Sequence, residues 1–146
     1  MRKINYIVVH CSATREGCTL TSEALEAEHR RRGFRTTGYH YYIRRDGTVL
    51  GTRSLELPGA HCRGHNKYSI GICYEGGLDA RGNPKDTRTP EQRSALHLLV
   101  YQLLQRFRNA RVCGHRDLSP DLDGDGTVEP WEWVKQCPCF EVSKEF

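Results

Sequence analysis

The stretch KINYIVVH, residues 3–10, sets the fold on which the rest of the chain builds. Its β-branched and aromatic residues form a short apolar run that ends in the polar cluster HCS, a pattern typical of a buried strand. We therefore predict a strand here that carries His10 to its C-terminal end. A polar side chain at the end of a buried strand is well placed for a functional site.

A first helix is predicted from TSEALEAEHRRRG, residues 21–33. Thr21 or Ser22 can serve as the N-cap, glutamate lies in the first turn and arginine in the last, and Gly33 ends the pattern.

Two further helices are expected toward the C-terminal half. TPEQRSALHLLVYQLLQRF, residues 89–107, predicts a long amphipathic helix with Thr89 as its cap and Pro90 at its first position. A last helix is predicted to begin at Pro130 and to run through WEWVKQ, residues 131–136.

The remaining apolar stretches predict strands. YHYYIRRDGTVLGTR, residues 39–53, alternates around Asp46-Gly47, which is a strong hairpin signal, and Tyr39 should begin its first strand. YSIGICYEGG, residues 68–77, and ARVCGH, residues 110–115, predict two more strands.

Strands interspersed with helices, plus one hairpin, predict an α/β fold with a central mixed β-sheet flanked by helices. The 146 residues are enough for one domain, so we expect a single domain over residues 1–146, and a monomer. No apolar run approaches the roughly 20 residues of a membrane span, and the apolar run near the start, residues 6–9, is too short for a signal peptide. The net charge of +4 suits an anionic polymer as partner.

Histidine and cysteine residues suggest a metal site. His10, His115 and one of Cys137 or Cys139 could supply three corners of a zinc tetrahedron and leave the fourth for water. Their separations follow no local spacing rule, so the residues alone do not establish such a site. The seven cysteines cannot all pair, and we expect most of them to be reduced and buried.

Six motifs in a fixed order carry a family resemblance. They are YIVVHCSAT, GYHYYIRRDGTV, GAHCRGHNKYSIGICYEGG, TPEQ, GHRD and KQCPCF. From about Ile4 to Phe140 the chain resembles the zinc-dependent N-acetylmuramoyl-L-alanine amidases, in the superfamily of phage lysozyme-type amidases and peptidoglycan recognition proteins. The resemblance implies hydrolysis of the amide bond between N-acetylmuramic acid and L-alanine in peptidoglycan, at a zinc site in a groove at one end of the sheet.

The resemblance also implies individual ligands. His10 of VHCSAT, His115 of GHRD and Cys137 of KQCP match the zinc ligands, and Cys137 precedes Pro138 as in the CP pair of the family. Cys139 remains the rival third ligand.

Catalytic and substrate roles follow from the same resemblance. Tyr39 matches a tyrosine beside the metal and Lys135 matches a catalytic lysine, and both could stabilise an oxyanion. His61 and Asn66 match the loop of the substrate groove. The alternative for this loop is a turn stabilised by its own polar side chains.

An acidic insertion at about residues 119–132 departs from the phage-type pattern. DLDGDGTVEPWE, residues 121–132, fits the calcium-loop pattern D-x-D-x-D-G-x5-E. Its expected ligands are Asp121, Asp123, Asp125, Thr127, Glu129 and Glu132. We predict a structural Ca²⁺ here, and the alternative is a solvated acidic loop without an ion.

The other histidines are expected to be structural or solvated. His40, beside Tyr39, and His97, on the apolar face of the long helix, are read as structural, and His29 as solvated.

A second class of function stays open, namely a non-catalytic peptidoglycan-binding or regulatory module. Nucleic acid is not expected as a partner, because no CxxC pair or aromatic-basic platform is present. We expect the protein to be made in a bacterial or phage-infected cytoplasm and to act at the cell wall after release or export.

Overall fold

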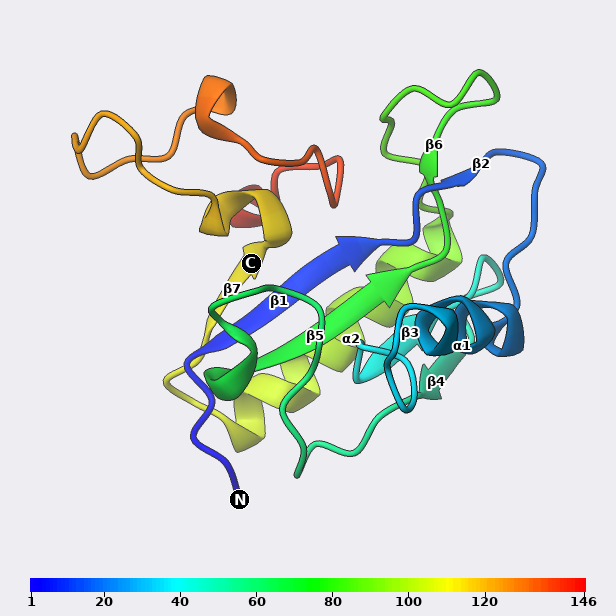
Figure 1. The fold of residues 1–146 in the computed structure, drawn as a ribbon, viewed down its shortest axis with the longest axis horizontal. Helices are drawn as coiled ribbons and strands as arrows, with labels where there is room; N and C mark the ends of the chain where they lie inside the picture. The colour runs from blue at the N-terminus through cyan, green and yellow to red at the C-terminus, as the bar shows by residue number, and fades with distance from the viewer.

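The structure is a computed structural model that describes residues 1–146. Strands are interspersed with helices along the chain, as the sequence predicts (Figure 1). The strands are β1 (Tyr6–Cys11), β2 (Thr14–Arg15), β3 (Tyr41–Ile43), β4 (Val49–Gly51), β5 (Ser69–Tyr74), β6 (Gly77–Leu78) and β7 (Arg111–Gly114). The helices are α1 (Ser22–Arg31) and α2 (Pro90–Arg106), and the short 3-10 helices are η1 (Asn66–Tyr68), η2 (His115–Leu118), η3 (Pro130–Glu132) and η4 (Val142–Lys144).

Five strands form the central sheet in the order β4-β3-β5-β1-β7. All neighbouring pairs are parallel except the β3–β4 hairpin, so the sheet is mixed, as expected. β1 lies between β5 and β7, which both follow it far along the chain. The carboxyl ends of these three parallel strands therefore meet at one end of the sheet, where ligand sites of α/β proteins commonly form.

The two faces of the sheet bury different helices. Ile7 and Val9 of β1 and Ile72 of β5 pack in the same cluster as the apolar residues of α2, which crosses one face (Figure 1). Leu25 of α1 packs with Cys73 of β5 in a smaller cluster with Tyr42 of β3, so α1 covers only the β3 side of the opposite face. Because side chains alternate along a strand, His10 lies on this second, less covered face.

Both predicted helix caps are present. Thr21 caps α1 by accepting a hydrogen bond from the Ala24 backbone N–H. Thr89 and Gln92 form a reciprocal capping box at the start of α2, directly before Pro90. Each cap satisfies backbone donors that the first turn of a helix leaves unpaired.

Two predicted boundaries are wrong. The first strand of the hairpin begins at Tyr41 rather than Tyr39, because the Tyr39 carbonyl accepts hydrogen bonds from the hydroxyls of Thr37 (3.0 Å) and Thr52 (2.8 Å). The helix predicted from Pro130 stops after one 3-10 turn at Glu132, and Trp133 is extended.

Tertiary contacts account for the missing last helix. The Glu132 carboxylate turns back to accept hydrogen bonds from the backbone N–H groups of Glu129 and Leu122. The Arg116 guanidinium stacks on the Trp133 ring, 3.8 Å from its centroid. These contacts hold the segment against η2 instead of letting it continue as a helix.

The acidic segment of residues 119–132 projects beside the β7 edge of the sheet, drawn in orange at the upper left of Figure 1. No helix in the structure is both long and apolar enough to cross a membrane.

Candidate functional site

Three side chains converge at the carboxyl end of the parallel strands. One ligand atom from each of His10, His115 and Cys137 lies within 4.8 Å of the other two. His10 comes from β1 and His115 from the first residue of η2, directly after β7, and their ring centroids are 4.6 Å apart. Two imidazoles and one thiolate are a donor set that zinc favours, and three protein ligands leave a fourth position open.

The loop that carries Cys137 is held on both sides of the cluster. The Cys137 sulfur accepts a hydrogen bond from the Cys11 backbone N–H (3.2 Å), next to His10. The Cys137 carbonyl accepts one from the Arg116 N–H (3.0 Å), next to His115. The backbone that presents each histidine therefore also positions the cysteine.

The protonation state of His10 suits a metal ligand. His10 is buried, and desolvation is the main reason that its pKa lies well below the usual value. The nearby His61, His115 and Lys135 lower this pKa further, since each adds positive charge when protonated. His10 is therefore neutral at pH 7, and a neutral imidazole is the form that binds metals.

Cys139 lies apart from this convergence. Its Sγ donates to the Gly77 carbonyl (3.4 Å), and its backbone has a positive φ of 72°. A hydrogen bond with the neighbouring Cys11 thiol, together with burial, raises the pKa of Cys139 far above its usual value, which disfavours the thiolate that zinc requires.

Tyr39 lies against the cluster. Its ring centroid is 5.1 Å from that of His10. Desolvation, together with the neighbouring thiols of Cys73, Cys137 and Cys11, raises the pKa of Tyr39 well above its usual value. The hydroxyl therefore keeps its proton at neutral pH and can act as a hydrogen-bond donor.

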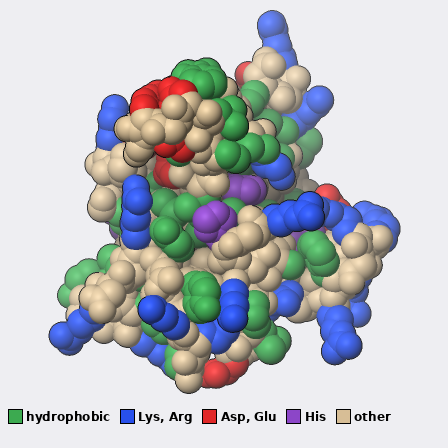
Figure 2. Space-filling model, turned by 60° about the vertical axis from the view of Figure 1, so that its left-hand side comes forward, with side chains coloured by type: hydrophobic (Ala, Val, Ile, Leu, Met, Phe, Trp, Pro, Cys, Tyr) green, Lys and Arg blue, Asp and Glu red, His purple; other side chains and the backbone are tan.

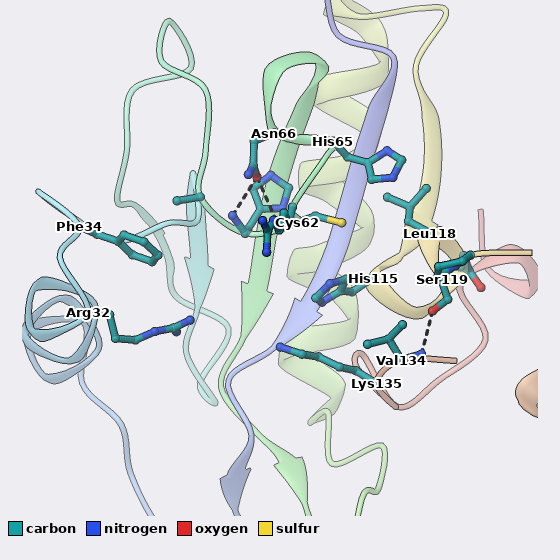
Figure 3. Close-up of a pocket in the computed structure, with 15 residues that line it drawn as sticks. Arg32, Phe34, Cys62, His65, Asn66, His115, Leu118, Ser119, Val134 and Lys135 are labelled. Atoms are coloured by element: carbon teal, nitrogen blue, oxygen red, sulfur yellow. Dashed lines mark hydrogen bonds between the residues drawn. The ribbon is translucent and has the colours of Figure 1, made fainter. Parts of the chain in front are cut away.

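A groove of about 970 Å³ opens in front of the histidines. Figure 3 shows Arg32 and Phe34 on one wall, Leu118 and Val134 on the opposite side, and Lys135 beside His115. Figure 2 shows histidine side chains within a hollow, Lys and Arg side chains around it, and acidic side chains gathered on the lobe above. The groove can accept an anionic, extended ligand next to the cluster.

The loop of His61 and Asn66 lines the groove, but its polar atoms are used internally. The Asn66 carboxamide oxygen accepts hydrogen bonds from the backbone N–H groups of His61 and Cys62, both at 2.9 Å (Figure 3). The His61 ring contacts His10 at 2.8 Å through Nδ1 and Ser69 at 3.1 Å through Nε2. Asn66 thus stabilises the turn, and both His61 nitrogens face protein partners.

Two readings of the other histidines are wrong. His29, expected to be solvated, is buried and accepts a hydrogen bond from the Gly38 N–H (2.8 Å). His97, expected on the apolar face of α2, is exposed and pairs with Glu145 (3.0 Å). His40 is structural as predicted, because it is buried and its Nδ1 accepts a hydrogen bond from the Gly71 N–H (3.0 Å).

The acidic insertion brings its carboxylates together in two overlapping groups. These are Asp121, Asp123 and Glu132, and Asp123, Asp125 and Glu129, each with oxygens within 4.8 Å of one another. Hydrogen bonds to the carboxylates of Glu132 and Asp125, which only the protonated form of Glu129 can donate, raise the pKa of Glu129 to about 8. One Glu129 carboxylate oxygen is buried without a hydrogen-bond partner.

Arg116 is an organising residue that the motifs did not single out. It follows His115 in GHRD, and its stacking on Trp133 joins η2 to the segment of Lys135 and Cys137. The adjacency to a candidate ligand was visible in the sequence, but the partner of Arg116 was not.

Comparisons with known proteins identify the family of the chain. Residues 1–138 match the family described as N-acetylmuramoyl-L-alanine amidase. An endolysin of Enterobacteria phage K11 is 35% identical over 136 residues, which are 93% of this chain and 81% of the relative. An endolysin of Klebsiella phage KP32 is 34% identical over 143 residues, covering 98% and 85%. The solved structure of the N-acetylmuramoyl-L-alanine amidase LysC from Clostridium intestinale superposes with a TM-score of 0.75 at 26% identity, over 99% of this chain and 82% of that one.

Proposed function

The chain belongs to the N-acetylmuramoyl-L-alanine amidase family and is a peptidoglycan amidase, and from this premise we propose that it works with one zinc ion held by His10, His115 and Cys137. The observation that carries the proposal is the approach of their three donor atoms to within 4.8 Å of one another. The bond cleaved is the amide between the lactyl group of N-acetylmuramic acid and L-alanine. A zinc ion would supply Lewis-acid activation of water and of the scissile carbonyl.

Tyr39 and Lys135 are the proposed catalytic side chains. Tyr39 keeps a protonated hydroxyl next to His10 and can donate to the oxygen of the scissile amide as negative charge develops there. Lys135 lines the groove beside His115 and brings an ammonium group to the same oxygen. Loss of one such donor typically lowers the rate on the order of a hundredfold.

The groove is the proposed binding site for the stem peptide. Arg32, Arg63 and Lys135 line it, and their positive charges complement peptide carboxylates. Phe34 and Val134 add apolar contact area for the sugar ring and side chains.

Digestion of purified peptidoglycan tests the activity. The expected products carry free N-terminal L-alanine without new reducing sugars, identified by mass spectrometry, and a zinc chelator should stop their release. New reducing ends would indicate a glycosidase instead. Co-sedimentation with peptidoglycan without any product would indicate the non-catalytic binding module.

We also propose that the insertion binds one structural Ca²⁺ through Asp121, Asp123, Asp125, Glu129 and Glu132, with the carbonyl of Thr127. The carboxylates lie close enough for Glu129 to share a proton with Glu132 and Asp125, which raises its pKa, and a hard cation with 6 to 8 oxygen ligands would bind the ionised group instead. After chelation and restoration of zinc, added Ca²⁺ should raise the melting temperature of the protein and not that of Asp123→Asn. If added Ca²⁺ leaves the melting temperatures of both proteins unchanged, the insertion is a solvated acidic loop without an ion.

A further inference from the structure

We infer that His61 is a positioning residue for the metal ligand His10, acting through a relay of hydrogen bonds from His10 to His61 to Ser69. This inference rests on the proposed zinc function. Nε2 of His10 lies 2.8 Å from Nδ1 of His61, and Nε2 of His61 lies 3.1 Å from the Ser69 hydroxyl oxygen. Ser69 is fully buried at the start of β5.

The relay has one consistent arrangement of protons when His10 binds a metal. Because His61 occupies Nε2 of His10, Nδ1 is the nitrogen that remains for the ion. A neutral imidazole that binds through Nδ1 carries its proton on Nε2. His10 must then donate to Nδ1 of His61, so His61 carries its own proton on Nε2 and donates it to Ser69.

The chain leaves a fitted slot for the His61 ring. A Cβ atom at Gly71 would come within 2.6 Å of the ring, and one at Gly59 would also collide with it. Gly71 of β5 pairs with Val8 of β1, and Val8 lies two residues before His10. The Gly71 N–H donates a hydrogen bond to Nδ1 of His40 (3.0 Å). Gly59, Gly71 and the buried His40 thus fix the position of the His61 ring, which faces His10.

These contacts distinguish His61 from a direct substrate contact. Both ring nitrogens have partners inside the protein, so neither is free to bind a ligand in the groove. Residues that orient a metal-binding histidine commonly change metal affinity or activity by about 10- to 100-fold when they are replaced. We therefore expect His61 to act on zinc affinity.

The test compares zinc dissociation constants of the purified full chain and its variants, measured by competition with a chromophoric chelator. His61→Ala should weaken zinc binding about 10- to 100-fold. The zinc affinity of His61→Asn should remain within a few-fold of the parent, because the asparagine oxygen can replace Nδ1 as the acceptor from His10. The side chain of His61→Gln is longer and places its oxygen toward Ser69 instead, so this variant should bind zinc as weakly as His61→Ala. His65→Ala is the matched control, since His65 lies in the same loop and packs on Tyr6, and it should leave zinc affinity unchanged.

Each outcome decides the role of His61. Parent-like zinc affinity in His61→Ala, with a raised KM alone, would overturn the inference and make His61 a substrate contact. If His61→Ala does not fold, equal zinc affinities of His61→Asn and His61→Gln would overturn it as well. Failure of the unmodified protein to bind zinc would instead overturn the proposed function, so the two failures are distinguishable.

Discussion

The side chains of Cys137 and Cys139 point in different directions, although the two residues are only two positions apart. The Cys137 sulfur faces His10 and His115, whereas the Cys139 sulfur faces the Gly77 carbonyl. We predict that Cys137→Ser abolishes bound zinc and lowers amidase activity at least a hundredfold, while Cys139→Ser keeps stoichiometric zinc. Elemental analysis after dialysis, together with the peptidoglycan digestion, measures both. Zinc retained in Cys137→Ser and lost in Cys139→Ser would reverse the ligand assignment.

His40 should make the protein less stable in mild acid. Burial lowers its pKa from 6.5 to about 4, so at pH 5 the folded chain keeps His40 neutral while the unfolded chain protonates it. The unfolded state then binds more protons, and stability falls as the pH drops from 6.5 toward 4, by up to about 1.4 kcal/mol per pH unit for this one group. Urea unfolding of the apo-protein between pH 7 and 5 should show a shallower decline in His40→Gln. Equal slopes in the two proteins would contradict this.

At the scale of the element, the capping box of α2 is the clearest local contribution to stability. The Thr89 hydroxyl accepts from the Gln92 N–H and also donates to the Arg45 carbonyl at 2.6 Å. We expect Thr89→Ala to cost about 1 to 2 kcal/mol of unfolding free energy. Ser94→Ala, an exposed position within α2, serves as the control and should change stability by less than about 0.5 kcal/mol. Urea denaturation of both variants checks the difference.

Elements were predictable from sequence where their signals are local. Thr89 before Pro90 and the Asp46-Gly47 turn each depend on neighbours within a few residues, and both were located correctly. The helix after Pro130 failed because its outcome depends on Arg116, many residues away. The predictions for His29 and His97 were wrong for a similar reason, because their partners Gly38 and Glu145 could not be read from local sequence patterns.

The family resemblance names the proposed zinc ligands, but it does not name the residues that position them. His10, His115 and Cys137 lie in motifs that the family resemblance identifies. The 2.8 Å contact between His61 and His10 could not be predicted from sequence, because the two residues are 51 positions apart and no local pattern links them. Gly59 and Gly71 leave room for the His61 ring, but they come next to this ring only in the folded protein, so the sequence alone does not reveal their role.

At the scale of the whole molecule, zinc should stabilise the entire fold. The proposed ligands come from the first strand, from the turn after β7 and from the segment that follows the insertion, so a bound ion would join parts far apart in the chain. Free zinc at about 1,000 times its dissociation constant adds about 4 kcal/mol of stability, which corresponds to a rise of about 10 °C in melting temperature for a domain of this size. Calorimetry of the apo-protein with and without zinc measures this shift. The shift should be absent in Cys137→Ser, and its presence there would contradict the ligand set.

The position of β1 between β5 and β7 has a consequence for synthesis. A ribosome makes β1 first, but the two strands that flank it are completed only when residues 69–74 and 111–114 have been translated. The third proposed zinc ligand, Cys137, follows still later. If the amidase works with zinc as proposed, a growing chain therefore cannot hold a complete zinc site until nearly all of the sheet is assembled, and it cannot become active on the ribosome before the domain has folded.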